Sequence, residues 1–436
     1  MSSEWNSYRL NEIGRIVTGK TPKSGIAEFV GNDVPFVTPT DFEGNKWIFR
    51  TARRISTAAA QSLKNNIIPA RSVLVTCIGS DMGKAALIES ASVTNQQINA
   101  IVVDETKFCP EFLYYNLAVR KIEIRNLAGG SAQPILNKTA FGQLRVDCPS
   151  LFEQKSLVEL LRPLDDRISL LRETNATLEA IAQVLYKSWF VDFDPVRAKV
   201  EEGAPEVLDA ATAALFPDSF EQSELGMVPR GWLVKPIGDA VECIGGGTPN
   251  TKDPSYWQPA EHAWTTPKDL SGLQSPVLLS TERKLSTLGL AKVSSGLLPA
   301  GTLLLSSRAP IGYLAIAQMP IAVNQGYIAI PSGGELSPLY MLFWCRQNME
   351  GIKARANGST FMEISKKTFR SIPALVPSAS VLAAFANLAD PLFERLIENE
   401  RHAQTLTKLR DTLLLPLISG QLRLPEAKAL AKAANR

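Results

Sequence analysis

The sequence has 436 residues, of which 45% are hydrophobic and 20% are charged, and its net charge is +3. A chain of this length forms two to four domains with ample cores, so it needs no disulfide or metal for stability. No apolar run approaches the ~18 residues of a membrane span and the start lacks a signal-peptide core, so we predict a cytoplasmic protein. Five scattered cysteines and two histidines leave metal sites, zinc fingers and Ser-His-Asp hydrolysis almost nothing to build on.

The charges are divided unevenly along the chain. Residues 1–150 hold 17 Lys and Arg against 13 Asp and Glu, and residues 229–378 hold 14 against 9. Residues 201–228 hold seven acidic residues and no basic ones. Basic domains joined by an acidic connector suit a polyanionic partner, although an excess of this size is also typical of an ordinary solvated surface.

The first notable element is Gly14–Thr21, "GRIVTGKT", which matches the phosphate-binding pattern GxxxxGKS/T. A working phosphate loop needs a buried strand before it, a helix that starts at the Lys, and an acidic residue that holds magnesium. Here the preceding residues are polar, and Pro22 follows directly. An NTPase built on this segment therefore stays only an alternative hypothesis.

The rest of residues 1–150 mixes short strand-like runs, such as "SVLVTCI" and "INAIVV", with Gly and Pro turns and one helical stretch near 111–125. This pattern predicts an α+β domain. Residues 151–200 show a heptad repeat, with leucines seven residues apart from Leu157 to Leu185. Pro163 is expected to start or kink the long helix there. Residues 201–228 are predicted to be an exposed acidic linker.

The chain then repeats itself at a shift of about 228 residues, so residues 229–378 predict a second α+β domain and residues 379–425 a second helix, followed by a tail at 426–436. The matched segments keep their order: "TGKTP" with "GGGTP", "TPTDFEG" with "TPKDLSG", "IIPARSVLV" with "LLPAGTLLL", and "AGGSAQPILNKTAF" with "ANGSTFMEISKKTF". In the second copy Gly14 and Lys20 of the phosphate pattern are replaced by Val241 and Gly247. The two copies therefore share the Thr-Pro turn but not the residues that would bind a nucleotide phosphate.

The two heptad segments predict an antiparallel coiled coil, the alternative being that each helix packs on its own domain. With Asn175 facing Asn399, Leu178 meets Leu396 and Leu171 meets Ala403, so large residues face small ones and two polar residues satisfy each other. Leu164 opposite Arg410 is the weak layer. The helix from Pro163 to Phe190 would be roughly 40 Å long, which is close to the ~34 Å turn of duplex DNA.

Four stretches carry a resemblance to a known family: "LYKSWFVDFDPVRAK" (185–199), "ELGMVPRGW" (224–232), "GGGTP" (245–249) and "LLPLISGQLRL" (414–424). They resemble the specificity (S) subunit of type I restriction-modification systems, over essentially the whole chain. The resemblance implies two target-recognition domains, each reading one half of a bipartite double-stranded DNA site, with the two helices as a ruler for the gap. It implies no catalysis in this chain.

By the same resemblance, two methyltransferase (M) subunits dock on the helices, and restriction (R) subunits join them to form an ATP-dependent nuclease. S-adenosylmethionine, ATP and Mg²⁺ are expected on those partners and not on this chain. A purely structural coiled-coil scaffold is the other alternative to a DNA-recognition subunit.

Two domains that read different sequences should share the residues that build the fold or hold phosphate, and differ where they meet base edges. The shared pairs include Thr21/Thr248, Lys138/Lys366 and Phe141/Phe369. Asn95 and Gln96 are shared with Asn324 and Gln325. They either form hydrogen bonds at the ends of strands, which we favour, or bind adenine bases through two hydrogen bonds. For the aromatic pair Trp189-Phe190 three roles are open: stacking on DNA bases, packing in the core, and forming a docking face for an M subunit. The heptad spacing favours the last two.

The candidates for DNA contact combine the shared polar residues with the diverged ones, each of which could also be an ordinary solvated residue. They are Thr18, Lys20, Thr21, Lys23, Ser80, Lys84, Gln97, Ser131, Gln133, Asn137 and Lys138 in the first copy, and Thr248, Asn250, Lys252, Arg308, Tyr313, Ser359, Thr360, Lys366 and Lys367 in the second. The predicted helix contacts are Leu171, Asn175, Leu178, Leu396, Asn399 and Ala403.

Overall fold

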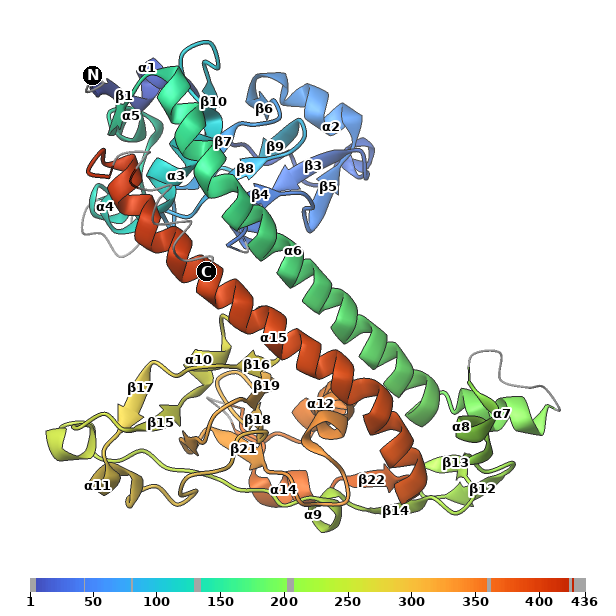
Figure 1. Ribbon diagram of the computed structural model, residues 1–436. Helices are drawn as coiled ribbons and strands as arrows, with labels where there is room; N and C mark the ends of the chain where they lie inside the picture. The colour runs from blue at the N-terminus through green and yellow to red at the C-terminus, as the bar shows by residue number, and fades with distance from the viewer. Residues whose placement is uncertain are drawn as a thin grey trace. The chain divides into compact units, whose positions relative to one another are not determined.

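The computed structural model describes residues 5–42, 44–79, 81–128, 135–201, 208–358, 362–422 and 426 (Figure 1). The chain divides into two compact units, residues 1–169 with 404–436 (unit 1) and residues 170–403 (unit 2). No helix in the described ranges has the length and apolarity to cross a membrane.

Unit 1 is an α+β domain in which short strands alternate with turns and short helices. Its elements before the long helix are β1 (Asn6–Arg9), α1 (Leu10–Ile13), β2 (Gly14–Thr18), η1 (Ala27–Phe29), β3 (Val34–Val37), η2 (Pro39–Asp41), β4 (Trp47–Ile48), β5 (Arg53–Ile55), α2 (Thr57–Ser62), η3 (Lys64–Asn66), β6 (Ile67–Ile68), β7 (Val73–Thr76), β8 (Ala85–Ile88), β9 (Ser92–Thr94), β10 (Ile98–Val103), α3 (Pro110–Ala118), α4 (Lys121–Asn126), α5 (Lys138–Gly142) and β11 (Arg145–Cys148).

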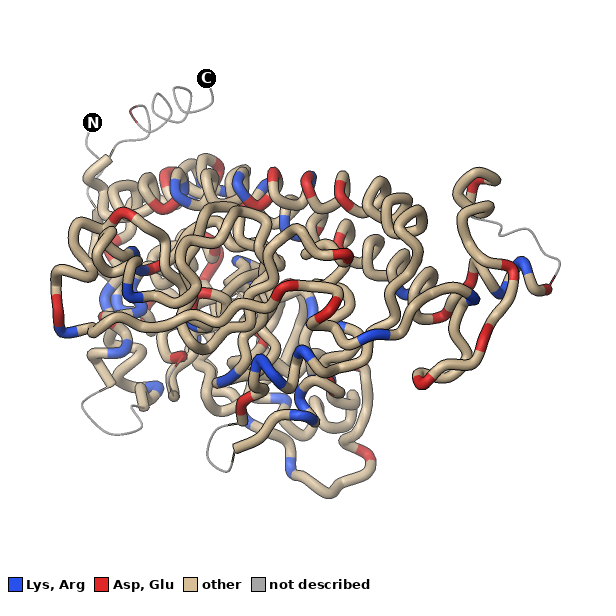
Figure 2. The backbone as a smooth tube through the Cα atoms, turned by 90° about the horizontal axis from the view of Figure 1, so that it is seen from below, with Lys and Arg blue, Asp and Glu red and all other residues tan. Residues whose placement is uncertain are grey.

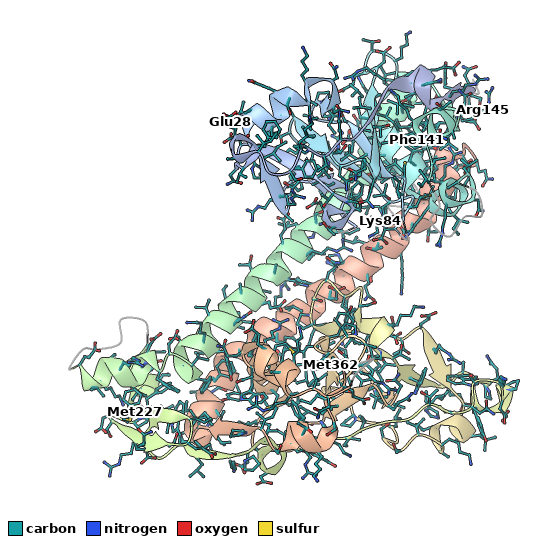
Figure 3. The ribbon with its side chains drawn as sticks, turned by 180° about the vertical axis from the view of Figure 1, so that it is seen from behind. Glu28, Lys84, Phe141, Arg145, Met227 and Met362 are labelled. Carbon is teal, nitrogen blue, oxygen red and sulfur yellow. The ribbon has the colours of Figure 1, made fainter. Side chains whose placement is uncertain are left out.

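Two mixed sheets form the body of unit 1, with strand orders β2-β10-β7-β8-β4 and β5-β3-β9-β6, and β1 pairs with β11. The central strands are buried on both faces, which is why "VLVT" is a continuous run of apolar and β-branched residues and not an alternating pattern. Phe141 lies among the side chains of this domain (Figure 3) and is completely buried.

Unit 2 repeats this topology. Its elements between the long helices are α7 (Asp194–Val200), α8 (Ala210–Ala214), β12 (Phe220–Ser223), β13 (Gly226–Pro229), β14 (Leu233–Pro236), α9 (Ile237–Ala240), η4 (Pro254–Tyr256), β15 (His262–Thr265), α10 (Pro267–Leu270), β16 (Val277–Leu278), β17 (Arg283–Leu285), α11 (Thr287–Leu290), β18 (Leu303–Ser306), β19 (Leu314–Ala317), β20 (Ala322–Val323), β21 (Tyr327–Ile330), α12 (Pro338–Gln347), α13 (Met349–Ala354), α14 (Lys366–Arg370) and β22 (Pro373–Val376).

The strand orders β16-β19-β18-β21 and β17-β15-β20 match β4-β8-β7-β10 and β5-β3-β9 of unit 1, and β14-β22 matches β1-β11. The same pairs are parallel in both units, β3 with β9 and β15 with β20. At the places of β2 and β6, unit 2 has only the isolated bridges Ile244–Ala329 and Leu298–Ile321. The sequence repeat is thus a repeat of the fold.

Two helices of 40 residues each follow the two domains: α6 (Leu151–Phe190) and α15 (Ala379–Ile418). Each is about 60 Å long at 1.5 Å per residue, and each contributes to both compact units. Acidic and basic residues are interspersed along both helices (Figure 2). Of the two expectations for Pro163, that it starts the helix is wrong, because Pro163 lies inside α6. The other, that it kinks the helix, stays a prediction.

The two helices pack antiparallel within each unit. In unit 2, Asn399 Nδ2 donates to Asn175 Oδ1 over 3.0 Å, and the rings of Trp189 and Phe385 lie 6.1 Å apart. In unit 1, Arg410 pairs with Asp165 at 3.0 Å. The two residue numbers of each pair add up to nearly the same value, which is the signature of an antiparallel register.

The segment expected to be an exposed linker is partly folded. Residues 202–207 lie outside the described residues, but α8 and the β12–β13 hairpin follow them. Phe216 and Val228 of this segment are only 3% exposed, and Phe216 packs edge-on against Trp189 at 4.9 Å. The acidic segment therefore contributes to the core of unit 2 and is more than a connector.

Candidate nucleic-acid interface

The segment "GRIVTGKT" does not form a phosphate-binding loop. Gly14 to Thr18 are strand β2, paired antiparallel with β10, and residues 19–24 that follow are not helical. A Cβ atom at Gly14 would lie 2.3 Å from the carbonyl oxygen of Val102, and one at Gly19 would lie 1.9 Å from that of Asn95. Both glycines are thus explained by close backbone approach within the sheet.

The turn after this strand is held in the same way in both units. In unit 1 the Thr21 hydroxyl donates to Gln96 Oε1 over 2.7 Å, and in unit 2 the Thr248 hydroxyl donates to Gln325 Oε1 over 2.6 Å. All four side chains are exposed. Each unit therefore presents a turn fixed to the end of the parallel strand β9 or β20.

The neighbouring asparagines support these strand ends. Asn95 Oδ1 accepts the backbone N–H of Gln97, and Asn324 Oδ1 accepts the backbone N–H of Gly326, which is an Asx turn in both units. Asn95 also donates to Gln97 Oε1 over 2.9 Å. Two interpretations were given for the asparagines, strand-end hydrogen bonding and adenine recognition. The observed hydrogen bonds are those of the first.

The turn itself carries the residues that differ between the units. Lys20 and Lys23 are exposed in unit 1, and Asn250 and Lys252 are exposed in unit 2. Thr18 is different: it is half-buried, and its hydroxyl donates to Asn99 Oδ1 over 2.7 Å. Side chains of different chemistry thus stand on one shared backbone frame.

The second candidate loop, after β7 or β18, is constrained by ion pairs. Lys84, labelled in Figure 3, pairs with Asp81 at 3.0 Å, and Arg308 pairs with Glu363 at 3.5 Å. Ser80 lies outside the described residues.

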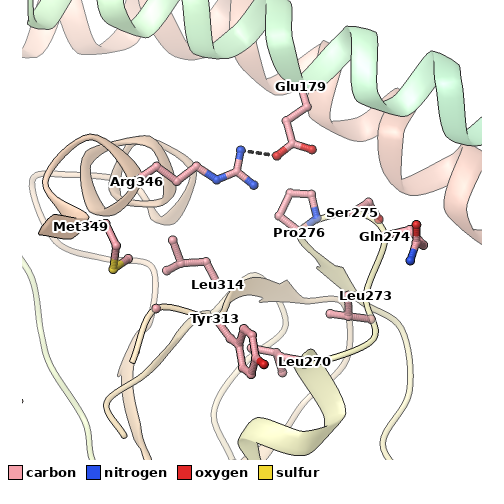
Figure 4. Close-up of a pocket in the computed structure, with 11 residues that line it drawn as sticks. Glu179, Leu270, Leu273, Gln274, Ser275, Pro276, Tyr313, Leu314, Arg346 and Met349 are labelled. Atoms are coloured by element: carbon pink, nitrogen blue, oxygen red, sulfur yellow. Dashed lines mark ion pairs between the residues drawn. The ribbon is translucent and has the colours of Figure 1, made fainter. Parts of the chain in front are cut away.

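Tyr313 lines a cavity of about 370 Å³ in unit 2 (Figure 4). Glu179 and Arg346 are the charged residues of its lining, and they form an ion pair with each other. The cavity therefore offers no unpaired charge for a substrate.

The third candidate loop leads into a short helix in each unit. Asn137 Oδ1 accepts the N–H of Ala140, and Ser365 Oγ accepts the N–H of Thr368, so these two diverged residues are the N-caps of α5 and α14. The lysines that follow, Lys138 in unit 1 and Lys366 and Lys367 in unit 2, are exposed. Ser131, Gln133, Ser359 and Thr360 lie outside the described residues.

The helix contacts named from the heptads lie in unit 2. Leu178 and Leu396 line one small apolar cavity between α6 and α15, and Leu171 and Ala403 are both buried. Asn175 and Asn399 are 2% and 3% exposed, and Asn175 Nδ2 also donates to the Leu396 carbonyl over 3.2 Å. Trp189 and Phe190 lie in the core of unit 2 rather than at its surface.

One further matched pair of segments is absent from the candidates. "TARRIST" (51–57) and "TERKLST" (281–287) share four letters in the same order, and each contains an exposed arginine, Arg53 or Arg283. The four shared residues of these two segments could have identified the two arginines from the sequence.

No group of His, Cys, Asp and Glu in the described parts of the chain is arranged to hold a metal ion. All five cysteines are free and buried, and burial raises the pKa of Cys77 and of Cys243 to about 11. A thiol with so high a pKa is protonated at neutral pH and is a poor nucleophile.

Comparison with known proteins finds a family model described as "Type I restriction modification DNA specificity domain", which matches residues 2–180 and again residues 229–413. The chain is 26% identical to the MjaIX specificity subunit of a type I restriction enzyme from Methanocaldococcus jannaschii, over 97% of this chain and 94% of that protein. It is 25% identical to the HindI specificity subunit from Haemophilus influenzae, over 96% of this chain and all of that protein.

The fold resembles the crystal structure of a type I restriction-modification system S subunit from M. genitalium. The TM-score is 0.51 at 15% sequence identity, and the match covers 95% of this chain and 96% of that one.

Proposed function

Because the chain belongs to the family of type I restriction-modification DNA specificity proteins, we propose that each of its two α+β domains reads one half of a bipartite DNA site. The chain directs partner subunits to that site and performs no catalysis itself. The long helices α6 and α15 fix the gap between the two half-sites.

The observation that carries this proposal is the turn at Thr21 and Thr248, which is held by the same hydrogen bond in both units but carries different exposed side chains. The Thr21–Gln96 and Thr248–Gln325 hydrogen bonds are the same, whereas Lys20 is replaced by Gly247. A protein that reads two unlike sequences with one fold needs a constant scaffold and variable exposed groups, since base edges differ in their donors and acceptors.

The partners are subunits of the same system. The chain works with methyltransferase (M) subunits and restriction (R) subunits, and we place two M subunits on the helices. The partners bring S-adenosylmethionine, ATP and Mg²⁺, and the complex works in the cytoplasm on double-stranded DNA. Adenine methylation and ATP-dependent cleavage are the activities that this chain directs.

Lys20 and Lys23 in unit 1, and Asn250 and Lys252 in unit 2, are the first candidates for base reading, because they are exposed on the fixed turn. Lys138, Lys366 and Lys367 are candidates for phosphate contact. The capping roles of Asn137 and Ser365 account for polar residues at those positions without DNA.

Mapping methylated adenines in the host genome, with and without this gene, tests the proposal. A split motif with a constant gap should be methylated only when the gene is present. If the methylation pattern does not change on deletion, the chain is not a specificity subunit, and a structural scaffold becomes the better interpretation.

A second measurement concerns the turn. Lys20→Ala should cost ~1 to 3 kcal/mol of binding free energy and relax the preference at one position of one half-site, if Lys20 meets a base edge. Lys107→Ala is the matched control, because it removes an exposed charge beyond the C-terminal end of β10, whereas Thr18 beside the turn pairs with Asn99 at the other end of that strand.

A further inference from the structure

The matched segments "TARRIST" and "TERKLST" are built by the same hydrogen bonds in both units. Asp41 Oδ1 accepts the N–H of Ala52 over 2.8 Å, and Asp269 Oδ1 accepts the N–H of Glu282 over 2.9 Å. The hydroxyl of each leading threonine donates to the carbonyl of the arginine two residues later, over 2.6 Å in unit 1 and 2.8 Å in unit 2. The backbone of Arg53 and that of Arg283 are therefore held in equivalent positions.

Each arginine side chain rests on an aromatic ring of the neighbouring strand. Arg53 pairs with Phe36 across β5 and β3, and its guanidinium carbon lies 5.1 Å from the centre of the Phe36 ring. Arg283 pairs with Trp264 across β17 and β15, 5.4 Å from the centre of that ring and 3.4 Å from that of Trp257. A guanidinium above an aromatic face is attracted to the ring while the N–H groups at its edge stay available.

These guanidiniums keep their hydrogen-bonding capacity. Both residues are exposed, and among the described residues neither guanidinium has an acidic partner or a hydrogen-bond acceptor. The next residue along provides a contrast, because the guanidinium of Arg54 already donates to the carbonyls of Asn32 and Asp33. Arg53 and Arg283 are thus fixed cations with unused donors, the arrangement that suits a phosphate.

We propose that Arg53 and Arg283 each bind a backbone phosphate of DNA, at equivalent points of the two half-sites. Phosphate fits better than a base edge because both units keep the same residue in the same geometry, although they read different sequences. A contact that does not depend on sequence is what the backbone offers. This inference rests on the proposed function and adds to it the residues that position the duplex on each domain.

The test uses the full chain in complex with its methyltransferase partner, and DNA duplexes with and without the methylated motif mapped above. Arg53→Ala and Arg283→Ala should each weaken binding to both duplexes by the same factor, roughly tenfold at 0.1 M salt. The slope of log K against log salt should become shallower by about 1 for each substitution. Arg53→Lys should keep the salt slope, because it keeps the charge.

Lys107→Ala, which removes a charge at an exposed site of the same unit beyond the C-terminal end of β10, should leave affinity and slope unchanged. An equal loss in Lys107→Ala would overturn the inference, since the effect would then be general electrostatics. Relaxed selectivity at one base position in Arg53→Ala would also overturn it in favour of base reading, and so would unchanged affinity in both arginine variants. If the natural complex itself shows no preference for the mapped motif, the proposed function fails instead.

Discussion

The two units share one topology, and in both the long helices pack on apolar domain residues, but the units differ at one place in this contact. In unit 1 that place holds a buried ionic network. Lys46 lies 3.5 Å from Glu111 and 4.0 Å from Asp165, and donates to the Tyr115 hydroxyl over 3.1 Å. Tyr115 donates in turn to Asp165, which also accepts from Arg410. Burial and the Asp165 carboxylate raise the pKa of Tyr115, so its proton stays in place.

In unit 2 apolar side chains take the places of Glu111, Tyr115 and Asp165. Phe343, the counterpart of Tyr115, belongs to an aromatic cluster, with its ring centre 5.8 Å from that of Tyr186. Tyr186 and Phe190 of α6 pack against Tyr340 of α12 and Phe385 of α15, with ring centres 5.0 to 6.0 Å apart. At a shift of 228 residues, Glu111 and Asp165 of unit 1 correspond to Leu339 and Phe393 of unit 2, Tyr115 to Phe343, and Arg410 to Ala182.

The difference shows that helix and domain can be joined by either kind of contact on the same backbone. A buried network is favourable only while every charge keeps its partners, because the desolvation cost of each ion remains when a partner is lost. An apolar cluster loses free energy in proportion to the volume removed. The two units should therefore respond differently to substitution.

The largest effect is expected at the aromatic cluster. Trp189 is 1% exposed and packs against Phe216 and Phe385. Trp189→Ala should cost about 3 to 5 kcal/mol of unfolding free energy, because it leaves a large cavity. Amide hydrogen exchange should localise the loss to unit 2. Phe152→Ala, at a site 79% exposed on the same helix, should change stability little, and a comparable loss there would contradict the comparison.

Breaking the network should come next. Lys46→Met leaves Glu111 and Asp165 without the ammonium group between them, at a cost of roughly 3 kcal/mol. We expect the lower end of the usual range because Arg162 still pairs with Glu111 and Arg410 with Asp165. Faster exchange of the α3 amides, with α12 unaffected, is the readout. Uniform weakening of both units would count against a local network.

A smaller effect is expected when the whole network of unit 1 is replaced by apolar residues, with the residues of unit 2 at four positions and Met at position 46. The variant combines Lys46→Met, Glu111→Leu, Tyr115→Phe, Asp165→Phe and Arg410→Ala. Since an entire buried network can be replaced by apolar residues of suitable volume, stability should lie within about 2 kcal/mol of the natural chain. It should exceed that of Lys46→Met alone in urea denaturation. A lower stability would mean that unit 1 specifically requires the charges.

The smallest effect concerns a surface ion pair found in unit 1. Arg120 holds Glu123 at 2.6 Å, and its hydrogen bonds lower the pKa of Glu123. Glu123→Gln should cost a few tenths of a kcal/mol. A lowered folded pKa means that the contribution is present above the unfolded pKa of the carboxyl and is lost as pH falls through the folded pKa. The natural chain and the variant should thus converge in stability at low pH; a constant difference would exclude the ion pair as its cause.

The helix seam was predictable because heptad positions depend on spacing alone. The opposition of Asn175 and Asn399, and of Trp189 and Phe385, follows from counting residues along two patterns. The partner of Arg410 could not be predicted in this way. Arg410 pairs with Asp165, which lies one position beyond the heptad residue Leu164 and also contacts Lys46 and Tyr115 of the domain. Contacts between residues far apart in sequence leave no periodic signal.

Pro163 misled the prediction for a local reason. Proline removes one helical hydrogen bond and crowds the carbonyl four residues earlier. Pro163 is exposed, so this disruption faces water, while Leu161 and Ile168 keep the helix packed on its other side. Tertiary packing thus overrides the local preference.

The candidate interface was predictable only in outline. Comparing the two copies located the turn at Thr21 and Thr248, because both copies keep the threonine. It could not show that Asn137 and Ser365 are helix caps, since different residue types serve the same capping role.

The five buried cysteines have a practical consequence for measurement. Because the natural thiols are buried, a maleimide reagent should react with an introduced surface cysteine far faster than with them. Cysteines at Lys107 in unit 1 and Ser332 in unit 2, both exposed positions away from the turns at Thr21 and Thr248, could carry a pair of fluorescent labels in the otherwise natural chain. Energy transfer between these labels would then report, in solution, how the distance between the two recognition domains responds to DNA.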